Sequence, residues 1–351
     1  MRRESSATAS LRNPLSGVGW GIVGVTAFSF TVPLTRVAVD HGGLSPLFVG
    51  AGRAVVAAVL AAAALVLTRQ PVPRRGLWPR IAVVAAGVVV GFPLLTSFAL
   101  SRTAASHGAV VIALLPAATA VLAVRRGGEQ VGPRFWGAVS AGAVAAVAFA
   151  IGQSGSPGSS AGLGWPDLLL FGAVLAAAAG YAEGGLLARE IGSWQTVSWA
   201  LVLSAPLMAV LTGGSVVASP QSGSAGQWLA FGYLGVVSMF LGFFAWYRGL
   251  AIGPMARVSQ VQLVQPVLSI CWAALLLGER LTWQTVLGAV CVIAGAGIAV
   301  RSRRLTARAA SDGPKEASVG EGAVSGGPRS SGSRAPAAAA CRAGCGRAGR
   351  R

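Results

Sequence analysis

Long apolar stretches recur along this chain and are separated by short polar segments. An α-helix of about 20 residues crosses a ~30 Å hydrocarbon core. The stretches have about this length and predict membrane-spanning helices near residues 16–38, 46–67, 80–100, 104–124, 134–151, 164–187, 194–213, 227–247, 254–277 and 282–300. Because the connections are short, neighbouring spans are expected to be antiparallel. The predicted fold class is an all-α integral membrane protein with ten transmembrane helices.

The two halves of the chain share a pattern that indicates an internal repeat. Two long apolar runs, each with a proline near its middle and a closing Gly-Glu pair, align with one another: Ala99–Glu129 and Gly249–Glu279. The alignment places Pro116 on Pro266. Each half would hold five spans, an odd number, so the second half would enter the membrane in the opposite sense. The sequence thus predicts inverted five-helix repeats at residues 16–151 and 164–300, joined by an outer linker at residues 152–163.

Composition supports the membrane class. The chain is 54% hydrophobic and 11% charged, whereas soluble proteins carry about 25% charged residues. Its net charge of +18 does not form a basic face on a soluble domain, which argues against nucleic-acid binding. Most arginines fall in segments on the side of the N-terminus, and the opposite loops and their edges hold only Arg36, Arg102 and Arg280. This bias predicts that both termini are cytoplasmic. The expected location is an inner or plasma membrane.

The ends of the chain are predicted to lie outside the repeats. Residues 1–15 form a short cytoplasmic N-terminus, and the first apolar run is too long for a signal-peptide core. After Val300 the composition changes to Arg, Ala, Gly, Ser and Pro, which predicts a disordered cytoplasmic tail at residues 301–351. Cys271 and Cys291 lie inside apolar runs and are expected to be small buried apolar side chains.

Several motifs resemble the EamA-type branch of the drug/metabolite transporter superfamily. They are the stretch Phe28–Arg36, Arg53 early in the second span, the two proline-to-Gly-Glu segments, and the run Leu275–Leu281 followed by Gly288. The resemblance covers all ten spans in two copies. It implies a ten-helix bundle that moves small metabolites, often outward. It also implies a central cavity lined mainly by spans 1, 3, 4, 6, 8 and 9.

Prolines and glutamines within the spans are the first candidate site residues. Pro116 and Pro266 each lie near the middle of a span, where proline removes a backbone hydrogen bond and bends the helix. Such a kink either shapes or gates the cavity or is a static packing feature, and its recurrence in both repeats favours the first role. Gln262 shares a helical face with Ser259 and Pro266. Its amide either binds a polar substrate or joins neighbouring helices.

Charged residues within the spans form a second group. Glu183 is the acidic residue that lies clearly inside a predicted span. It is a proton carrier, a counter-ion for a cationic substrate, or a salt-bridged structural acid. Arg53 either binds an anionic or zwitterionic substrate or bonds helix-end carbonyls, and we favour the structural role. Glu129 and Glu279 lie at predicted helix ends, where glutamate ordinarily caps or pairs.

Three aromatic residues are further candidates, because the resemblance places their spans at the cavity: Phe30, Phe92 and Tyr181. Interfacial belts and lipid-facing packing account for most aromatic residues in spans. We therefore expect few aromatic side chains to contact substrate.

Patterns of catalysis, of metal binding and of ATP binding do not occur in the sequence, and His41 and His107 lie near the predicted outer surface without a ligand cluster. We therefore expect no enzyme activity, metal or cofactor.

The predicted function is a secondary transporter, with export favoured, for small polar or amphipathic metabolites such as amino acids. It would work by alternating access, through facilitated diffusion or proton exchange. The predicted partners are a small-molecule substrate and the lipid bilayer, and a homodimer is left open. The alternatives are an uptake permease of the same fold, or a non-transporting membrane scaffold or intramembrane enzyme.

Overall fold

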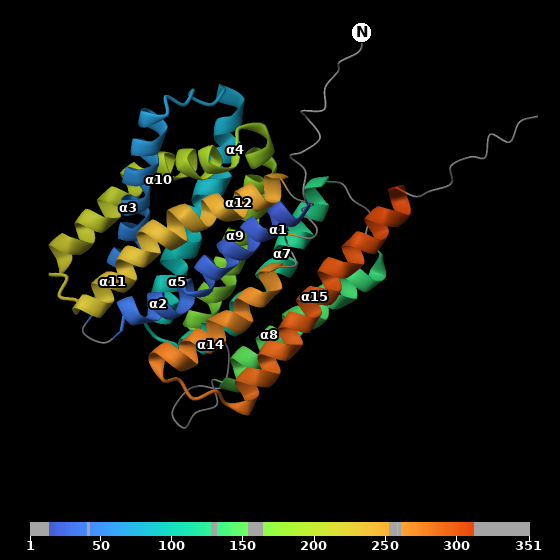
Figure 1. Cartoon of the computed structure of the whole chain (residues 1–351). Helices are drawn as coiled ribbons and strands as arrows, with labels where there is room; N and C mark the ends of the chain where they lie inside the picture. Colours follow the sequence, from blue (N-terminus) through green and yellow to red (C-terminus); the bar gives the residue numbers. More distant parts are fainter. Residues whose placement is uncertain are drawn as a thin grey trace, which may run out of the picture. The chain divides into compact units, whose positions relative to one another are not determined.

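Helices form every regular element in the described part of the chain (Figure 1). The computed structural model describes residues 14–40, 43–127, 132–153, 164–252, 258 and 261–311. All of them fall within one compact unit. The prediction of an all-α protein is confirmed for these residues, whereas the predicted positions Glu129 and Ser259 lie outside them.

The described residues of the first half form ten helical elements. They are α1 (Pro14–Ser29), α2 (Thr31–Ala38), α3 (Pro46–Leu67), the 3₁₀-helix η1 (Arg75–Leu77), α4 (Trp78–Val84), the π-helix η2 (Ala85–Gly91), α5 (Phe92–Leu100), α6 (Ala105–Ile112), α7 (Leu115–Gly127) and α8 (Pro133–Gln153).

The second half repeats this order with fewer interruptions. Its described elements are α9 (Trp165–Glu190), α10 (Ser193–Ala218), α11 (Ala225–Tyr233), the π-helix η3 (Leu234–Gly242), α12 (Phe243–Ile252), the 3₁₀-helix η4 (Gln262–Val264), α14 (Gln265–Leu277) and α15 (Trp283–Ser311).

Eight helical segments of the described chain are long and apolar enough to cross a membrane, and they lie close to the first eight predicted spans. They are Gly17–Ala38, Pro46–Leu67, Arg75–Leu100, Ala105–Arg126, Pro133–Gly152, Trp165–Glu190, Ser193–Ala218 and Ala225–Ile252. Shorter apolar helices, Gln262–Leu277 and Trp283–Ile298, fall in the ninth and tenth predicted spans. Helix α15 continues to Ser311, past Val300, where the sequence predicts the tail to begin.

Local sequence determines where several helices begin and end. The side chain of Ser45 accepts a hydrogen bond from the amide of Phe48 and caps α3, whose first residue is a proline. Helix α14 ends at Leu277 and is followed by Gly278, which has a φ of 65°. Glycine adopts this left-handed conformation without steric strain. The glycine of the Gly-Glu pair is therefore a helix stop signal.

The two halves interrupt their helices at matching places. The third span contains π-helix η2, and its counterpart, the eighth span, contains π-helix η3. The fourth span breaks between Ile112 and Leu115, and the ninth passes through η4 before α14 begins at Gln265. The alignment that places Pro116 on Pro266 also brings these interruptions together. The repeat seen in the sequence is thus reproduced in backbone geometry.

The helices of the two halves pack against each other in a reciprocal pattern. Helix α3 packs along α10, α6 along α14, and α8 along α15, so the second, fourth and fifth spans each contact their own counterparts. Helix α1 packs along α12, and α9 along α5 and η2, so span one contacts span eight and span six contacts span three. This set of contacts is the one expected if the two copies are related by a pseudo-two-fold axis.

Helices α8 and α15 lie side by side (Figure 1) and approach closely at two glycines. A Cβ atom placed on Gly295 would lie 2.8 Å from the Cα atom of Gly142 and 3.0 Å from its nitrogen. Real Cβ atoms do not approach backbone this closely. Small residues therefore let the fifth and tenth spans meet, a common device in membrane proteins.

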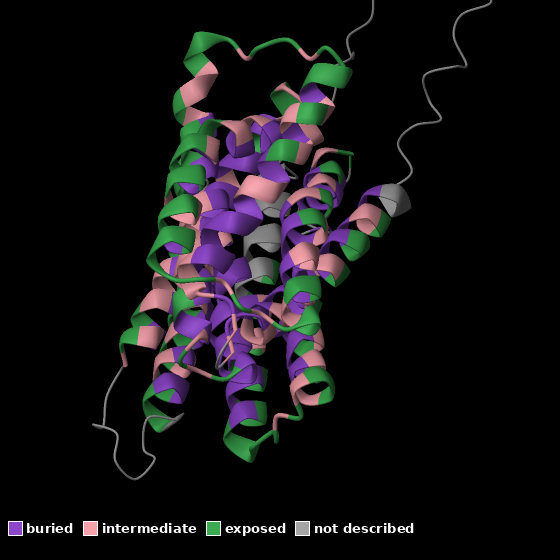
Figure 2. Cartoon of the chain, turned by 90° about the vertical axis from the view of Figure 1, so that its left-hand side faces the viewer, coloured by how far each residue is buried: buried purple, intermediate pink, exposed green. Residues whose placement is uncertain are grey.

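Buried residues lie between the helices, and exposed residues lie on the outward faces (Figure 2). Many of the exposed residues are large and apolar; Leu67, Val217 and Leu229 are 82%, 89% and 76% exposed. Such a surface suits hydrocarbon and not water. Cys271 and Cys291 are also exposed, so the expectation that both are buried is wrong. Lipid and protein interior are equally apolar, and hydropathy therefore does not distinguish them.

Candidate functional site

The broken helices of the two repeats meet at a small cleft. Three pairs of equivalent residues line it: Ile112 with Gln262, Leu115 with Gln265, and Pro116 with Pro266. Val32, Ala109 and Ser269 complete the lining. Its volume is about 10 Å³, the space that one ordered water needs. In this conformation the cleft is therefore closed to a metabolite.

Prolines account for the helix breaks at the cleft. Pro116 lies in the first turn of α7 and Pro266 in the first turn of α14. Proline has no amide hydrogen to offer the carbonyl four residues earlier, at Ile112 or Gln262, and its ring clashes with that carbonyl. Upstream of Pro116, the amide of Leu114 instead bonds the carbonyl of Val111, 3.2 Å away. The α-helical pattern is thus interrupted beside the proline in both spans.

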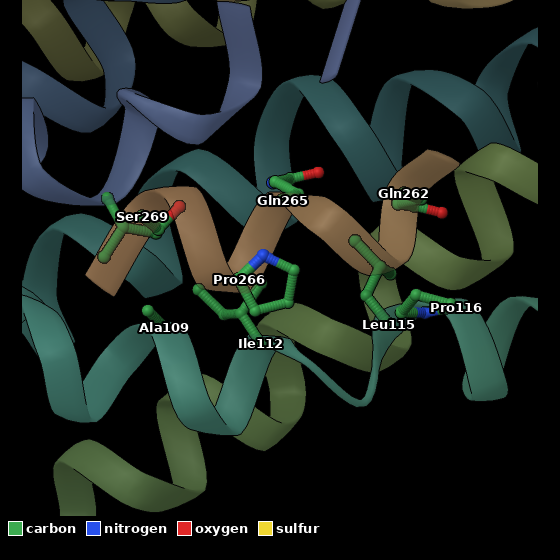
Figure 3. Close-up of a pocket in the computed structure, with 9 residues that line it drawn as sticks. Ala109, Ile112, Leu115, Pro116, Gln262, Gln265, Pro266 and Ser269 are labelled. Carbon is green, nitrogen blue, oxygen red and sulfur yellow. The ribbon is translucent and has the colours of Figure 1, made fainter. Parts of the chain in front are cut away.

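The cleft is polar on the side of the second repeat and apolar on the side of the first. Figure 3 shows the amides of Gln262 and Gln265 on one side, Ile112 and Leu115 on the other, and Pro266 between them. The two glutamines are 3% and 7% exposed. Gln262 Nε2 and Gln265 Oε1 lack a hydrogen-bond partner among the described residues. An unpaired buried amide group costs about 1–3 kcal/mol, so these two atoms are available to a polar ligand.

Ser269 joins the cleft to a neighbouring helix, whereas Phe30 and Tyr181 pack against other rings outside the cleft. Ser269 Oγ donates to the carbonyl of Ser29, 2.7 Å away, and so fixes α14 to α1. Phe30 stacks on Trp272 with ring centroids 4.4 Å apart. Tyr181 packs among aromatic rings of α1 and α12, including Phe28 and Trp246.

The structure therefore gathers only some of the predicted site residues. Pro116, Gln262 and Pro266 line the cleft. Five others lie elsewhere: Phe30, Arg53, Phe92, Tyr181 and Glu183. Phe92 is half-buried at the first position of α5. Substrate contact by these residues stays a prediction.

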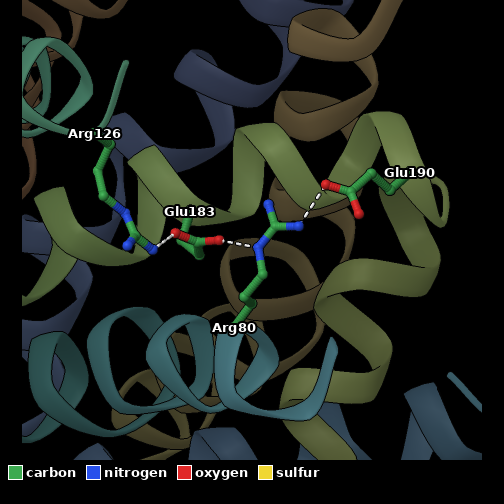
Figure 4. Close-up of polar contacts among 4 residues, drawn as sticks. All are labelled: Arg80, Arg126, Glu183 and Glu190. Atoms are coloured by element: carbon green, nitrogen blue, oxygen red, sulfur yellow. Dashed lines mark hydrogen bonds and ion pairs between the residues drawn. The ribbon is translucent and has the colours of Figure 1, made fainter. Parts of the chain in front are cut away.

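Glu183 connects the two repeats at one end of α9. Its carboxylate is 2% exposed and accepts hydrogen bonds from Arg80 of α4 and Arg126 of α7. Arg80 also bonds Glu190, so four charged side chains form a continuous row (Figure 4). This geometry matches the salt-bridged alternative for Glu183. We call these four residues the charged row.

A second set of polar contacts connects the repeats toward the start of α9. His107 Nε2 lies 2.7 Å from Asp167 Oδ1, and both residues are buried. Asp167 Oδ2 accepts from the amide of Gly164 and so also caps α9. The sequence analysis places His107 near the outer surface without a ligand cluster, and it does not predict the pairing with Asp167. Asp167 is a further polar residue that the sequence reasoning missed, although its spacing from Gly164 is that of a capping box.

Glu279 adds to these contacts. Its two carboxylate oxygens accept from the amides of Ala105 and Ser106, at 2.7 and 2.9 Å. A glutamate was expected to cap a helix at this position, and Glu279 caps α6 of the opposite repeat. Its charge also complements the positive N-terminal end of the α6 dipole.

Arg53 lies on α3 and is buried, with 2% of its surface exposed. Its Nη1 lies 3.5 Å from Thr35 Oγ1, and its Nη2 lies 3.2 Å from Thr96 Oγ1. The favoured structural role was expected to involve helix-end carbonyls. The guanidinium bonds two hydroxyl groups on α2 and α5 instead.

Broken helices around a partly polar cleft, built from two repeats of an apolar helical protein, are typical of membrane transporters. A model described as the EamA-like transporter family matches the chain twice, at residues 15–151 and 164–301. The chain therefore belongs to the EamA-like transporter family. The two matches fall on the two predicted repeats.

Individual relatives agree with this assignment. The chain is 43% identical over 280 residues to the "Uncharacterized transporter YdeK" of Bacillus subtilis (strain 168), covering 78% of this chain and 94% of that protein. A 71-residue stretch is 39% identical to an "Uncharacterized transporter" of Archaeoglobus fulgidus and covers 20% of this chain and 26% of that protein. A solved structure described as "Crystal structure of protein" has a TM-score of 0.57 and 19% identity, over 84% of this chain and 99% of its own. That likeness concerns the fold.

Proposed function

We propose that this transporter exports small polar or amphipathic metabolites, amino acids among them, by alternating access across the inner or plasma membrane. Ten spans, as two inverted repeats with cytoplasmic termini, would carry out the movement. The observation that carries the proposal is the cleft, where equivalent residues of the two repeats meet with unpaired amide atoms on one wall. A site between repeats is exposed to either side when the repeats rock against each other.

The contacts at the two ends of α9 support this mechanism. With the termini inside, the charged row closes the cytoplasmic end, and His107–Asp167 with the Glu279 cap closes the outer end. Each set joins the first repeat to the second. Alternating access requires that one set separates while the other holds, and both sets are formed here. We therefore interpret this conformation as the occluded intermediate of the cycle.

We favour export by analogy with the EamA-type family, and the direction of transport can be measured. Cells that overproduce the intact protein would be compared with cells that produce Gln262→Ala at the same level, by profiling metabolites in medium and cytoplasm. Gln284→Ala is the matched control, because Gln284 is exposed on α15, away from the cleft.

We expect one metabolite class to accumulate outside with the intact protein and with Gln284→Ala, and to accumulate less with Gln262→Ala. Depletion of a metabolite from the medium would identify an uptake permease of the same fold. If metabolite levels do not differ between cells that produce the intact protein and cells that lack it, the result would contradict transport and favour a scaffold role.

A further inference from the structure

A buried arginine without a counter-charge lies close to the cleft. Arg53 has five N–H donors, and the described residues provide two hydroxyl contacts, one of them at the 3.5 Å limit. Its Nε atom is fully buried and has no partner in the described chain. A charged group inside the membrane is costly unless it is paired, and its default interpretation is functional.

Acidic residues of the described chain do not supply the missing charge, because each is bound elsewhere. Asp40 pairs with Arg36, Asp167 with His107, Glu183 with Arg80 and Arg126, and Glu190 with Arg80, while Glu279 caps α6. The guanidinium of Arg53 is therefore a buried cation whose protein partners are neutral hydroxyls.

The two hydroxyls are oriented so that they hold the guanidinium in place. Thr35 Oγ1 donates its own hydrogen to the carbonyl of Thr31, and Thr96 Oγ1 donates to the carbonyl of Phe92, each at 2.6 Å. Their lone pairs remain for Arg53. One side chain is thus fixed by α2 and the other by α5, and both hold the planar group between them.

Helix α2 connects this arginine to the cleft. Thr35 contacts Arg53, and Val32, one turn earlier on the same helix, lines the cleft. Three residues of α-helix rise roughly 4.5 Å. The cleft and the guanidinium therefore lie against neighbouring turns of α2, and one ligand could contact both once the repeats separate.

We infer that Arg53, held by Thr35 and Thr96, binds the carboxylate of the transported molecule, while Gln262 and Gln265 bind its other polar group. Guanidinium and carboxylate form paired, parallel hydrogen bonds, which neutral groups do not replace. The substrate class is then a small carboxylic acid with a second polar group, such as a zwitterionic amino acid. This inference rests on the proposed transport function but is tested by binding alone.

The test uses purified full-length protein in detergent and measures its thermal unfolding midpoint with each of the common amino acids and with each corresponding methyl ester. An ester keeps the side chain and amine but removes the negative charge. We expect at least one acid to raise the midpoint where its ester does not. Arg53→Gln should weaken binding of that acid and raise its half-saturating concentration roughly tenfold or more.

Arg102→Gln is the matched control, because Arg102 is exposed and its loss changes the net charge by the same amount. It should leave the acid's effect unchanged. Arg53→Lys keeps a charge but loses the planar fork, and should bind the acid more weakly than the intact protein. The ester comparison on the intact protein holds even where the Arg53 variants fail to fold.

Two results would overturn the inference: no acid that stabilises better than its ester, or equal acid binding by Arg53→Gln. Neither result decides whether the protein transports a metabolite. Acid binding without metabolite flux in cells would keep the carboxylate site and reject transport. Flux confined to molecules without a carboxylate would keep transport and reject this site.

Discussion

Asp167 and Glu183 lie on one helix, α9, roughly 24 Å apart along its axis, and each bonds a side chain of the opposite repeat. Asp167 contacts His107 near the start of the helix, and Glu183 contacts Arg80 and Arg126 near its end. One helix therefore carries a connection at each end of the protein. A tilt of α9 would stretch one connection and relieve the other, as alternating access needs.

Removing the carboxylate of Glu183 should destabilise the charged row. Glu183→Gln leaves Arg80 and Arg126 without their shared counter-charge, and Glu183 is 2% exposed. Because Arg126 is 56% exposed and partly screened by water, we expect a loss of about 1–3 kcal/mol, below that of a fully buried pair. Thermal unfolding of the purified protein measures it.

Glu190→Gln is the matched control for this prediction. Glu190 bonds the same Arg80 but is 46% exposed, so its loss should cost about 0–1 kcal/mol. Equal destabilisation by the two variants would show that burial of Glu183 does not strengthen its ion pairs.

Asp167 has two roles, and its variants should separate them. Asp167→Ala removes the acceptor for the His107 ring and for the amide of Gly164, with an expected loss of about 1–3 kcal/mol. Asp167→Asn keeps one oxygen and should lose less. A double-mutant cycle of Asp167→Asn with His107→Ala should give a coupling energy above about 0.5 kcal/mol. Additive effects would argue that the contact contributes nothing to stability.

The prolines at the cleft should matter more for transport than for folding. Pro266→Ala restores an amide that can bond the Gln262 carbonyl and extend α14 across the break. We expect an unchanged or higher unfolding midpoint and a several-fold slower export of the metabolite identified by profiling. Pro206→Ala, inside α10, is the control for removing a proline away from the cleft. If both variants slow export equally, the kink at the cleft has no special role.

Glycines at the contact of α8 and α15 should not tolerate a side chain. Gly295→Ala places a methyl group 2.8 Å from the Gly142 Cα atom, and overpacking of this kind costs about 1–3 kcal/mol. Gly137→Ala on α8 meets nothing within 4 Å and should be neutral or slightly stabilising. A lower unfolding midpoint for Gly295→Ala alone supports the close approach, and equal midpoints would contradict it.

Hydropathy was sufficient to place most spans, because a bilayer-crossing helix needs a minimum apolar length that single residues hardly disturb. The repeat and both proline breaks were also visible, since Pro116 and Pro266 act on their own helices. The π-helices η2 and η3 were not predicted. Their backbone geometry depends on packing against other helices, which local sequence does not specify.

The sequence pattern did not predict which polar residues, far apart along the chain, contact each other. His107 and Asp167 are separated by 60 positions, and Arg53 and Thr96 by 43. Nothing near either residue indicates its partner. Gln262 lies at the cleft beside Pro266, and the spacing of the two residues along one helix is visible in the sequence. Contact between Gln262 and substrate stays a prediction.

The measurement that tests this account most directly is export with the outer end held shut. His107→Cys and Asp167→Cys would be combined in a chain whose four native cysteines are replaced by alanine, and joined by a short reducible cross-linker. We predict that cross-linking stops export of the metabolite found by profiling and that reduction restores it, while either single variant is unaffected by the reagent. Export that continues through the cross-linked protein would contradict alternating access between these repeats.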